Sequence, residues 1–318
     1  MENIQIKLNT FNQIMSAENG KARIYDKKEA QLMTRATYAS VIAGTSLVII
    51  KLVAYILTGS VALLTSLIDS FIDVLVSIIN VFAVKQSLIP ADKEHRFGHG
   101  KIESLAGLAQ AAFICGSVLF IIFESVNKLV YPTAIEHGLI GIIVMLISIF
   151  VTIILVLFQK YVIKKTKSLA IIADSLHYSS DLLFNISVII AIILSYYFNY
   201  VLADPIIALG IAVFIIYNAW QIAKSCLDQL MDRELPDDDR DKIREIALSH
   251  SLVRDIHGFR SRKSGRDIFI QLHLEMDHRL NLETAHKIAV DVGNRICEVY
   301  PNADVIIHQD PDTEINQN

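Results

Sequence analysis

The stretch IIADSLHYSSDLLFNISVIIAIIL occupies residues 171–194, and most of it is apolar enough to cross a membrane. Its first half nevertheless carries Asp174, His177 and Asp181, whose spacing places them near one face of a helix. A charged side chain at the centre of a bilayer costs about 2.5–3.5 kcal/mol even on a mild insertion scale. We therefore expect this helix to turn its ionisable groups toward another polar surface inside a membrane domain.

The rest of the chain has the composition of a membrane protein with polar flanks. Of its 318 residues, 53% are hydrophobic and 19% are charged, whereas a soluble domain is about 25% charged. The net charge of −4 gives no reason to expect nucleic acid as a partner. Six apolar blocks, each near the length of about 20 residues that crosses a bilayer, predict six spans. We place these spans at residues 36–57, 62–86, 103–128, 138–159, 169–196 and 205–227.

Lysine and arginine predict the orientation of these spans. They are frequent in the N-terminal segment and in the loops after the second and fourth spans, and nearly absent from the loops on the other side. The positive-inside rule then places both termini in the cytoplasm, as an even number of spans requires. We see no cleavable signal peptide, and the three widely separated cysteines predict no disulfide framework.

The chain is predicted to have three parts: a cytoplasmic N-terminal segment (1–34), a six-span all-α membrane domain (35–228) and a cytoplasmic domain (235–312). The last part reads as a helix, two strands, a helix and a strand, which is an α+β domain in the order αββαβ. The two strands are expected to turn at Ser264-Gly265.

Alternation along the second of these strands separates two faces. Ile270 and Leu272 point to the side that the helices should cover, and Phe269 and His273 point to the opposite side.

Two predicted spans carry matched pairs of polar residues. Asp69 and Asp73 lie one turn apart on the second span, and His177 and Asp181 lie one turn apart on the fifth. Three carboxylates and an imidazole offer four oxygen and nitrogen ligands, which suit Zn²⁺, and Fe²⁺ or Cd²⁺ could also fit. Asp174, one turn nearer the cytoplasm, is expected either to line the entrance or to be a plain helix-end carboxylate.

Several alternatives remain open at this point. The polar pairs could simply join two helices, or could relay protons without a metal. An organic-solute transporter, a membrane-anchored metal sensor and a proton-only channel are competing classes. The first is disfavoured because the spans have no cationic anchor at mid-membrane; Lys51, near the end of the first span, is expected to snorkel to the surface. A sensor would explain histidines in the tail, but not the carboxylates in the spans.

Two more groups of histidines lie outside the spans. Asp92, His95 and His99 follow the second span with spacing that lets a short turn present three ligands, although a solvated loop explains them equally well. Four histidines and one aspartate of the tail could hold a two-metal cluster bridged by the aspartate, although each histidine alone is compatible with an ordinary surface position. These five are His257, His273, His286, His308 and Asp310.

The motifs together resemble the cation diffusion facilitator family, and within it most closely the bacterial efflux transporters of zinc and ferrous iron. The resemblance runs from about Arg35 to Pro311. It is carried by TGSVALLTSLIDSFIDVL, FGHGKIESLAGLAQ, ADSLHYSSD, LDQLMDREL and FIQLHLEM with the later AHKIA and DVIIHQDP. It implies a homodimer in the lipid bilayer of the cell inner membrane, with a metallochaperone-like cytoplasmic domain and no enzymatic activity.

The resemblance also implies roles for individual residues. The transport site would be Asp69, Asp73, His177 and Asp181; the loop site Asp92, His95 and His99; and the cytoplasmic binuclear site the five tail residues named above. Lys101 and Asp232 would form a salt bridge at a hinge, and Leu176 would be a hydrophobic gate.

The function implied is a proton-coupled antiporter that exports divalent transition-metal cations by alternating access. Zn²⁺ comes first, as cargo and as a structural ion, with Fe²⁺ and Cd²⁺ as further substrates. Family members selective for manganese tend to replace the site histidine by a carboxylate, so His177 favours zinc.

Overall fold

The computed structural model describes residues 27–131, 139–198 and 202–312. It divides into two compact units. The helical unit comprises Asp26–Leu88 and Ile102–Leu227, and the sheet unit includes Ile89–Lys101 and the described part of Asp228–Asn318. Most of the predicted segment 1–34 and the end of the chain after residue 312 therefore lie outside the described residues.

The described part of the helical unit contains six long helices. They are α2 (Lys27–Thr58), α3 (Val61–Ser87), α4 (Lys101–Val130), α5 (Leu139–Thr166), α6 (Leu169–Phe198) and α7 (Ala203–Leu230). All but α6 are long and apolar enough to cross a membrane by themselves, so six spans remain a prediction. Helices α2 and α5 run several residues beyond their predicted spans, because hydropathy marks only the apolar part of a helix that polar residues can continue.

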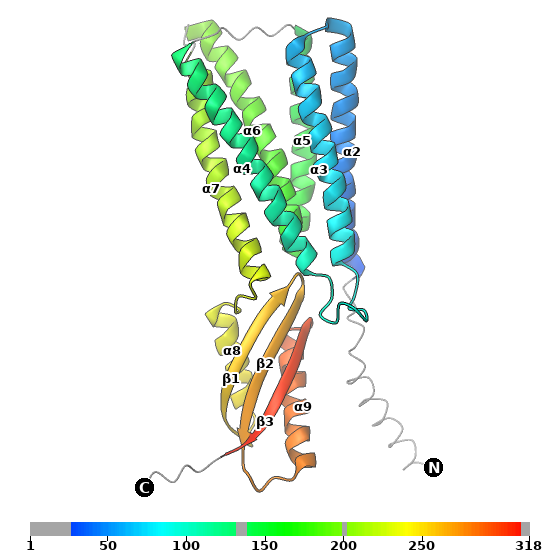
Figure 1. Ribbon diagram of the computed structural model, residues 1–318, viewed down its shortest axis with the longest axis vertical. Coiled ribbons are helices and arrows are strands. Elements are labelled where there is room, and N and C mark those ends of the chain that lie inside the picture. Colours follow the sequence, from blue (N-terminus) through cyan, green and yellow to red (C-terminus); the bar gives the residue numbers. More distant parts are fainter. Residues whose placement is uncertain (1–26, 132–138, 199–201, 313–318) are drawn as a thin grey trace, which may run out of the picture. The chain divides into compact units, whose positions relative to one another are not determined.

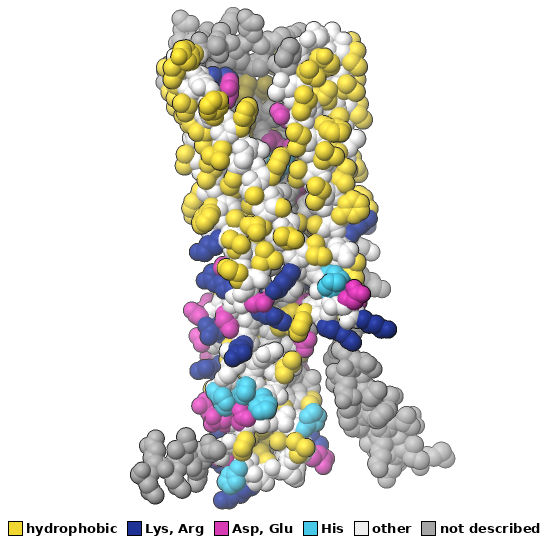
Figure 2. All heavy atoms as spheres, viewed as in Figure 1, with side chains coloured by type: hydrophobic (Ala, Val, Ile, Leu, Met, Phe, Trp, Pro, Cys, Tyr) yellow, Lys and Arg dark blue, Asp and Glu magenta, His cyan; other side chains and the backbone are white. Residues whose placement is uncertain are grey.

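The helices pack through small apolar clusters and turn large apolar side chains outward. Helix α2 packs against α3 and α5, α5 packs against α6, and α4, α6 and α7 share a cluster around Ile114 and Ile215 (Figure 1). Hydrophobic side chains predominate on the face of this unit that Figure 2 shows, and Ile56, Phe82 and Phe120 are each about 70% exposed. So broad an apolar exterior suits lipid rather than water, as expected of a membrane domain.

The sheet unit has the element order that was predicted for the tail. Its elements are α8 (Asp237–Leu248), β1 (Val253–Ser264), β2 (Asp267–Met276), α9 (Leu282–Val299) and β3 (Ala303–Pro311). Strand β2 is central, antiparallel to β1 and parallel to β3. The antiparallel pair needs only the short turn after Ser264, where Gly265 has φ +60°. The parallel pair needs the crossover that α9 provides.

The faces of β2 follow the predicted alternation with one exception. Ile270 and Leu272 are fully buried in a core that also contains Ile243 of α8 and Ile296 of α9. Phe269, expected on the uncovered face, is buried too. Phe97 from the loop Ile89–Lys101 contacts its ring edge-on, with the ring centroids 5.4 Å apart. Part of the opposite face of the sheet is therefore covered by this loop.

The loop Ile89–Lys101 approaches the β1–β2 turn closely at Gly100. A Cβ atom at this position would lie 2.2 Å from the backbone oxygen of Ser264, a distance that no packing adjustment of a side chain can relieve. We expect Gly100→Ala to displace the loop, seen as faster hydrogen exchange in residues 89–101. Gly210→Ala is the matched control, because a Cβ there meets nothing within 4 Å. Unchanged exchange in Gly100→Ala would contradict this packing.

Candidate metal centres

The helical unit contains a cavity of about 670 Å³ whose wall is largely apolar but carries a group of polar side chains. Figure 2 shows acidic side chains in a hollow of this unit, surrounded by hydrophobic ones. The residues that line the cavity come from α2, α3, α4, α5 and α6. They include Lys51, Ser66, Asp69, Ser70, Asp73, Ser148, Thr152, His177, Asp181 and Asn185.

Three of the four predicted transport-site residues converge on one point of this cavity. His177 Nε2 lies 3.0 Å from Asp73 Oδ1 and 3.7 Å from Asp181 Oδ2. One ligand atom from each residue lies within 4.8 Å of the other two, a spacing that one cation could bridge. Asp69 lines the same cavity one turn along α3 but is not part of this group.

Local sequence explains how these three side chains meet. The four-residue spacing of His177 and Asp181 puts them on one face of α6, and that face meets α3. The neighbouring Tyr178 fixes the register: its hydroxyl lies 3.0 Å from Ser77 Oγ of α3 and donates to the Ser40 carbonyl of α2. Three helices are thereby joined next to the site.

Two expectations for single residues of the spans are wrong. Lys51 does not snorkel: its ammonium donates to Ser70 Oγ at 2.6 Å, inside the protein. Asp174 does not line an open entrance either, because it is only 1% exposed. A lysine in a span usually extends its aliphatic stem toward the membrane surface, but the Lys51 ammonium instead donates to a hydroxyl of the neighbouring helix.

Asp174 is instead the centre of a buried hydrogen-bond network that sequence reasoning missed. It accepts from Ser40 Oγ at 2.5 Å, Gln110 Nε2 at 2.9 Å and Gln159 Nε2 at 2.7 Å. These partners come from α2, α4 and α5, so one carboxylate ties together four helices. The available signal was the presence of Gln110 and Gln159 in otherwise apolar spans.

Leu176, the predicted gate, precedes the site histidine and is half-buried. It packs against the cluster around Ile114 and Ala212, and also against the cluster around Ala173 and Ile222. It therefore lies where α4, α6 and α7 meet. Its action as a gate remains a prediction.

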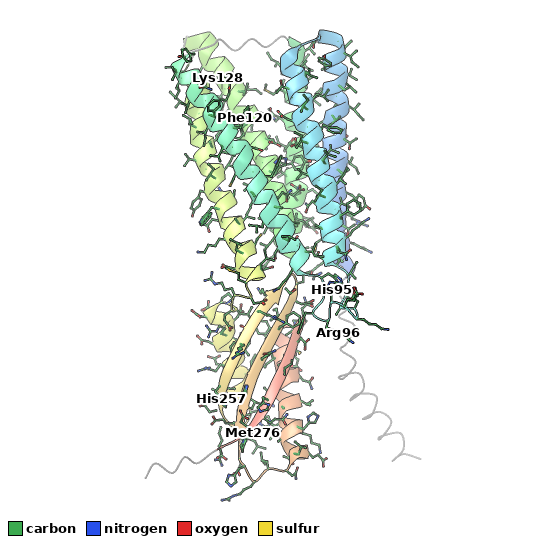
Figure 3. All side chains as sticks on the ribbon, viewed as in Figure 1. His95, Arg96, Phe120, Lys128, His257 and Met276 are labelled. Atoms are coloured by element: carbon green, nitrogen blue, oxygen red, sulfur yellow. The ribbon has the colours of Figure 1, made fainter. Side chains whose placement is uncertain are left out.

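The loop residues Asp92, His95 and His99 form a second compact group in the sheet unit. His95 Nδ1 lies 3.5 Å from one Asp92 carboxylate oxygen, and His99 Nε2 lies 3.5 Å from the other. The backbone N–H of His95 donates to Asp92 Oδ1 and holds the pKa of that carboxyl below its usual value. The pre-ionised carboxylate and two imidazoles suit a divalent transition metal. Figure 3 shows His95 in this loop.

A third group is a row of histidines across the uncovered face of the sheet. His257 of β1 is opposite His273 of β2, and His273 is opposite His308 of β3. Asp310 lies within 3.1 Å of a ring nitrogen of each of these three histidines. The hydrogen bond from His273 lowers the pKa of Asp310, and the nearby imidazoles act in the same direction. Figure 3 labels His257 on this sheet.

The structure modifies the membership of the third group. His286 is exposed on α9, and α9 covers the face of the sheet opposite to His273, so within one chain it is not placed with the others. Glu275, which sequence reasoning missed, is 3.1 Å from His257 Nδ1. The sequence could have predicted this position, because Glu275 is two residues from His273 and therefore on the same face of β2.

A further acidic group of the sheet unit contains Asp277, His278 and Asp312. Arg254 forms ion pairs with both of these carboxylates. The arginine contacts both carboxylates and offsets part of the charge that would attract a metal, so we assign no metal to this group.

The predicted hinge pair is close in the structure. Lys101 Nζ lies 2.9 Å from Asp232 Oδ1, and Asp232 also contacts Arg262 at 3.2 Å. The Arg262 guanidinium lies over the rings of Phe97 and Phe269. The pair thus belongs to a larger contact between the loop and β1. Whether it acts as a hinge remains a prediction.

Comparison with known proteins identifies relatives for both units. A family model described as the cation efflux transmembrane domain matches residues 36–231, and one described as the cytoplasmic domain of cation efflux proteins matches residues 235–312. The chain is 45% identical over 281 residues to the cation-efflux pump FieF of Cronobacter sakazakii, covering 88% of this chain and 93% of that protein. It is 46% identical over 286 residues to the protein of the same name from Yersinia pestis, covering 90% and 95%.

Solved structures match about a quarter of the chain. A structure of CzrB is 21% identical and covers 25% of this chain and 99% of its own, with a TM-score of 0.24. A structure of the MamM CTD is 22% identical and covers 24% of this chain and all of its own, with a TM-score of 0.24.

Proposed function

Because the chain belongs to the cation efflux family, also called the cation diffusion facilitators, we propose that it exports divalent transition-metal cations from the cytoplasm. The observation that carries this proposal is the convergence of Asp73, His177 and Asp181 in a cavity of a membrane domain. Ionisable groups are costly in such a domain and commonly mark the path of an ion or a substrate. The test is metal-dependent flux through the purified protein in liposomes.

The donor set supports zinc as the first cargo. The His177 imidazole and the carboxylates of Asp73 and Asp181 provide three donors, and Asp69 would provide the fourth. Zn²⁺ accepts such a set of oxygen and nitrogen donors. Fe²⁺ and Cd²⁺ are the next candidates, whereas Mn²⁺ prefers an all-oxygen set. Alternating access would expose this set first to the cytoplasm and then to the opposite side, with Leu176 as a hydrophobic gate.

Protons are the proposed counter-ions. Moving a divalent cation out against an inside-negative potential costs about 4.6 kcal/mol per 100 mV, so export needs a coupled influx. A metal binds only deprotonated ligands, so protons and metal compete for the same atoms. His177 is the proposed proton carrier, because imidazole titrates nearest to neutral pH. One proton per zinc would still move one charge outward, so the pH gradient would have to contribute.

The setting we propose is a homodimer in the cell inner membrane, with both termini cytoplasmic. Residues 35–228 would transport the cation, and residues 235–312 would bind metal and join two protomers. The uncovered sheet face supports this second role: three imidazoles and a carboxylate suit zinc, and His257, His273, His308 and Asp310 would hold it. Bound there, zinc would supply a cross-link between strands. Asp92, His95 and His99 of the loop would hold a further ion.

Removing two of the three histidines in the row tests the cytoplasmic site separately. We expect the double variant His257→Ala/His308→Ala to lose the zinc that the tail binds, because two of the ligands around Asp310 are gone. Zinc per protomer, measured by elemental analysis after dialysis, should fall by about one ion or more. His250→Ala, a change of a histidine outside the row, is the control. Full zinc content in the double variant would rule out this assignment.

A further inference from the structure

Lys51 lies in the wall of the transport cavity and turns its charge inward. Its ammonium donates to Ser70 Oγ at 2.6 Å and to the Ser66 carbonyl at 3.2 Å, both on α3. Of the described residues that line the cavity, it is the one lysine or arginine. A positively charged group in the wall of a cation site affects what binds there.

The charges of the cavity balance only when Lys51 is counted. Asp69, Asp73 and Asp181 line the cavity, and each interacts electrostatically with the ammonium. With all three ionised they carry three negative charges, which Lys51 and one divalent cation together neutralise. Without Lys51 the loaded cavity would keep one unpaired negative charge. An uncompensated charge in a low-dielectric wall would hold a cation more tightly.

We propose that Lys51 is a fixed counter-cation of the transport site, which weakens the binding of the divalent cation enough for it to leave. This inference rests on the proposed function. A transport site must bind well enough to fill and weakly enough to empty, and three carboxylates with an imidazole would otherwise favour retention. The lysine repels the cargo without contacting the ligand group itself, because its hydrogen bonds go to Ser66 and Ser70.

The competing role for Lys51 is structural. The same two hydrogen bonds connect α2 to α3, so the side chain could serve as a tether whose charge is irrelevant. Three substitutions at this one position separate the roles. Lys51→Gln keeps a hydrogen-bond donor and removes the charge, Lys51→Met removes both, and Lys51→Arg keeps both.

The experiment measures zinc binding and zinc transport in the full-length protein. Zinc affinity is determined at pH 8, where proton competition is weak, by competition with a fluorescent chelator. Each variant is paired with the same variant carrying Asp181→Asn, and the difference isolates the transport site from the other metal sites. Initial rates in proteoliposomes give KM and the maximal rate.

If the charge matters, Lys51→Gln and Lys51→Met both bind zinc at least about tenfold more tightly than the wild type, with lower KM and lower maximal rate. Lys51→Arg should stay near the wild type. Should Lys51→Met not fold, Lys51→Gln and Lys51→Arg still decide the question. Affinity and KM in Lys51→Gln equal to the wild type would overturn the proposal. A wild-type protein that transports no divalent cation would contradict the proposed function instead.

Discussion

The variant Asp73→Asn is expected to lose zinc transport by about 100-fold or more. Asparagine keeps the shape of aspartate but removes its charge and replaces one oxygen ligand by an amide nitrogen, which cannot bind a metal through its N–H group. The position is central, because Asp73 Oδ1 lies 3.0 Å from His177 Nε2 and so connects α3 to the pair on α6. Loss of a residue that only hydrogen-bonds to a metal ligand typically lowers metal affinity or activity about 10- to 100-fold, and loss of a ligand itself should have a larger effect.

Initial rates of zinc uptake in proteoliposomes measure this effect. Asp241→Asn, the same substitution at an exposed position on α8, is the matched control and should transport like the wild type. The amount of protein inserted is compared for each preparation, so that a loss of rate is not a loss of protein. Transport by Asp73→Asn at the wild-type rate would show that the cation does not pass through this group.

Zinc uptake into everted membrane vesicles is expected to fall to background when a protonophore collapses the proton gradient. The physical reason is the competition of protons and metal for the same ligands, which makes proton entry the only proposed source of energy. In everted vesicles the interior is positive and opposes the entry of zinc. Collapsing the electrical potential alone with valinomycin and potassium should therefore not inhibit uptake.

The two ionophores thus have different expected effects. Inhibition by the protonophore with none by valinomycin supports exchange driven by the pH gradient. Uptake that continues undiminished in the protonophore would reject the antiport mechanism and leave cation efflux itself intact. Vesicles that carry Asp73→Asn give the background in both cases.

The helices and strands were largely predictable, because their signals are local. Apolar length marks a span, and alternation marks a half-buried strand, as Ile270 and Leu272 illustrate. The exact helix ends were not, since α5 continues to Thr166 through polar residues. The burial of Phe269 was unpredictable for another reason: the residue that covers it, Phe97, is distant in the sequence.

The meeting of Asp73, His177 and Asp181 was predictable, because each belongs to a matched pair on a helix; Asp69, the partner of Asp73, lines the cavity but lies outside this group. The four-residue spacing of His177 and Asp181 already implies a shared face. The roles of Lys51 and Asp174 were not predictable, because single polar residues carry no information about their partners. Only the fold reveals that the Lys51 ammonium donates to Ser70. It likewise reveals that the buried Asp174 carboxylate accepts hydrogen bonds from one serine and two glutamines, Ser40, Gln110 and Gln159.

The central claim is that this protein carries divalent transition metals through the cavity that holds Asp73, His177 and Asp181. Its most direct test is flux in proteoliposomes that contain only the purified protein, with Zn²⁺, Fe²⁺, Cd²⁺ and Mn²⁺ offered in turn. We expect saturable uptake of zinc, weaker uptake of iron or cadmium, and little of manganese. Empty liposomes set the background. The absence of metal-dependent flux above that background for all four cations would contradict the account.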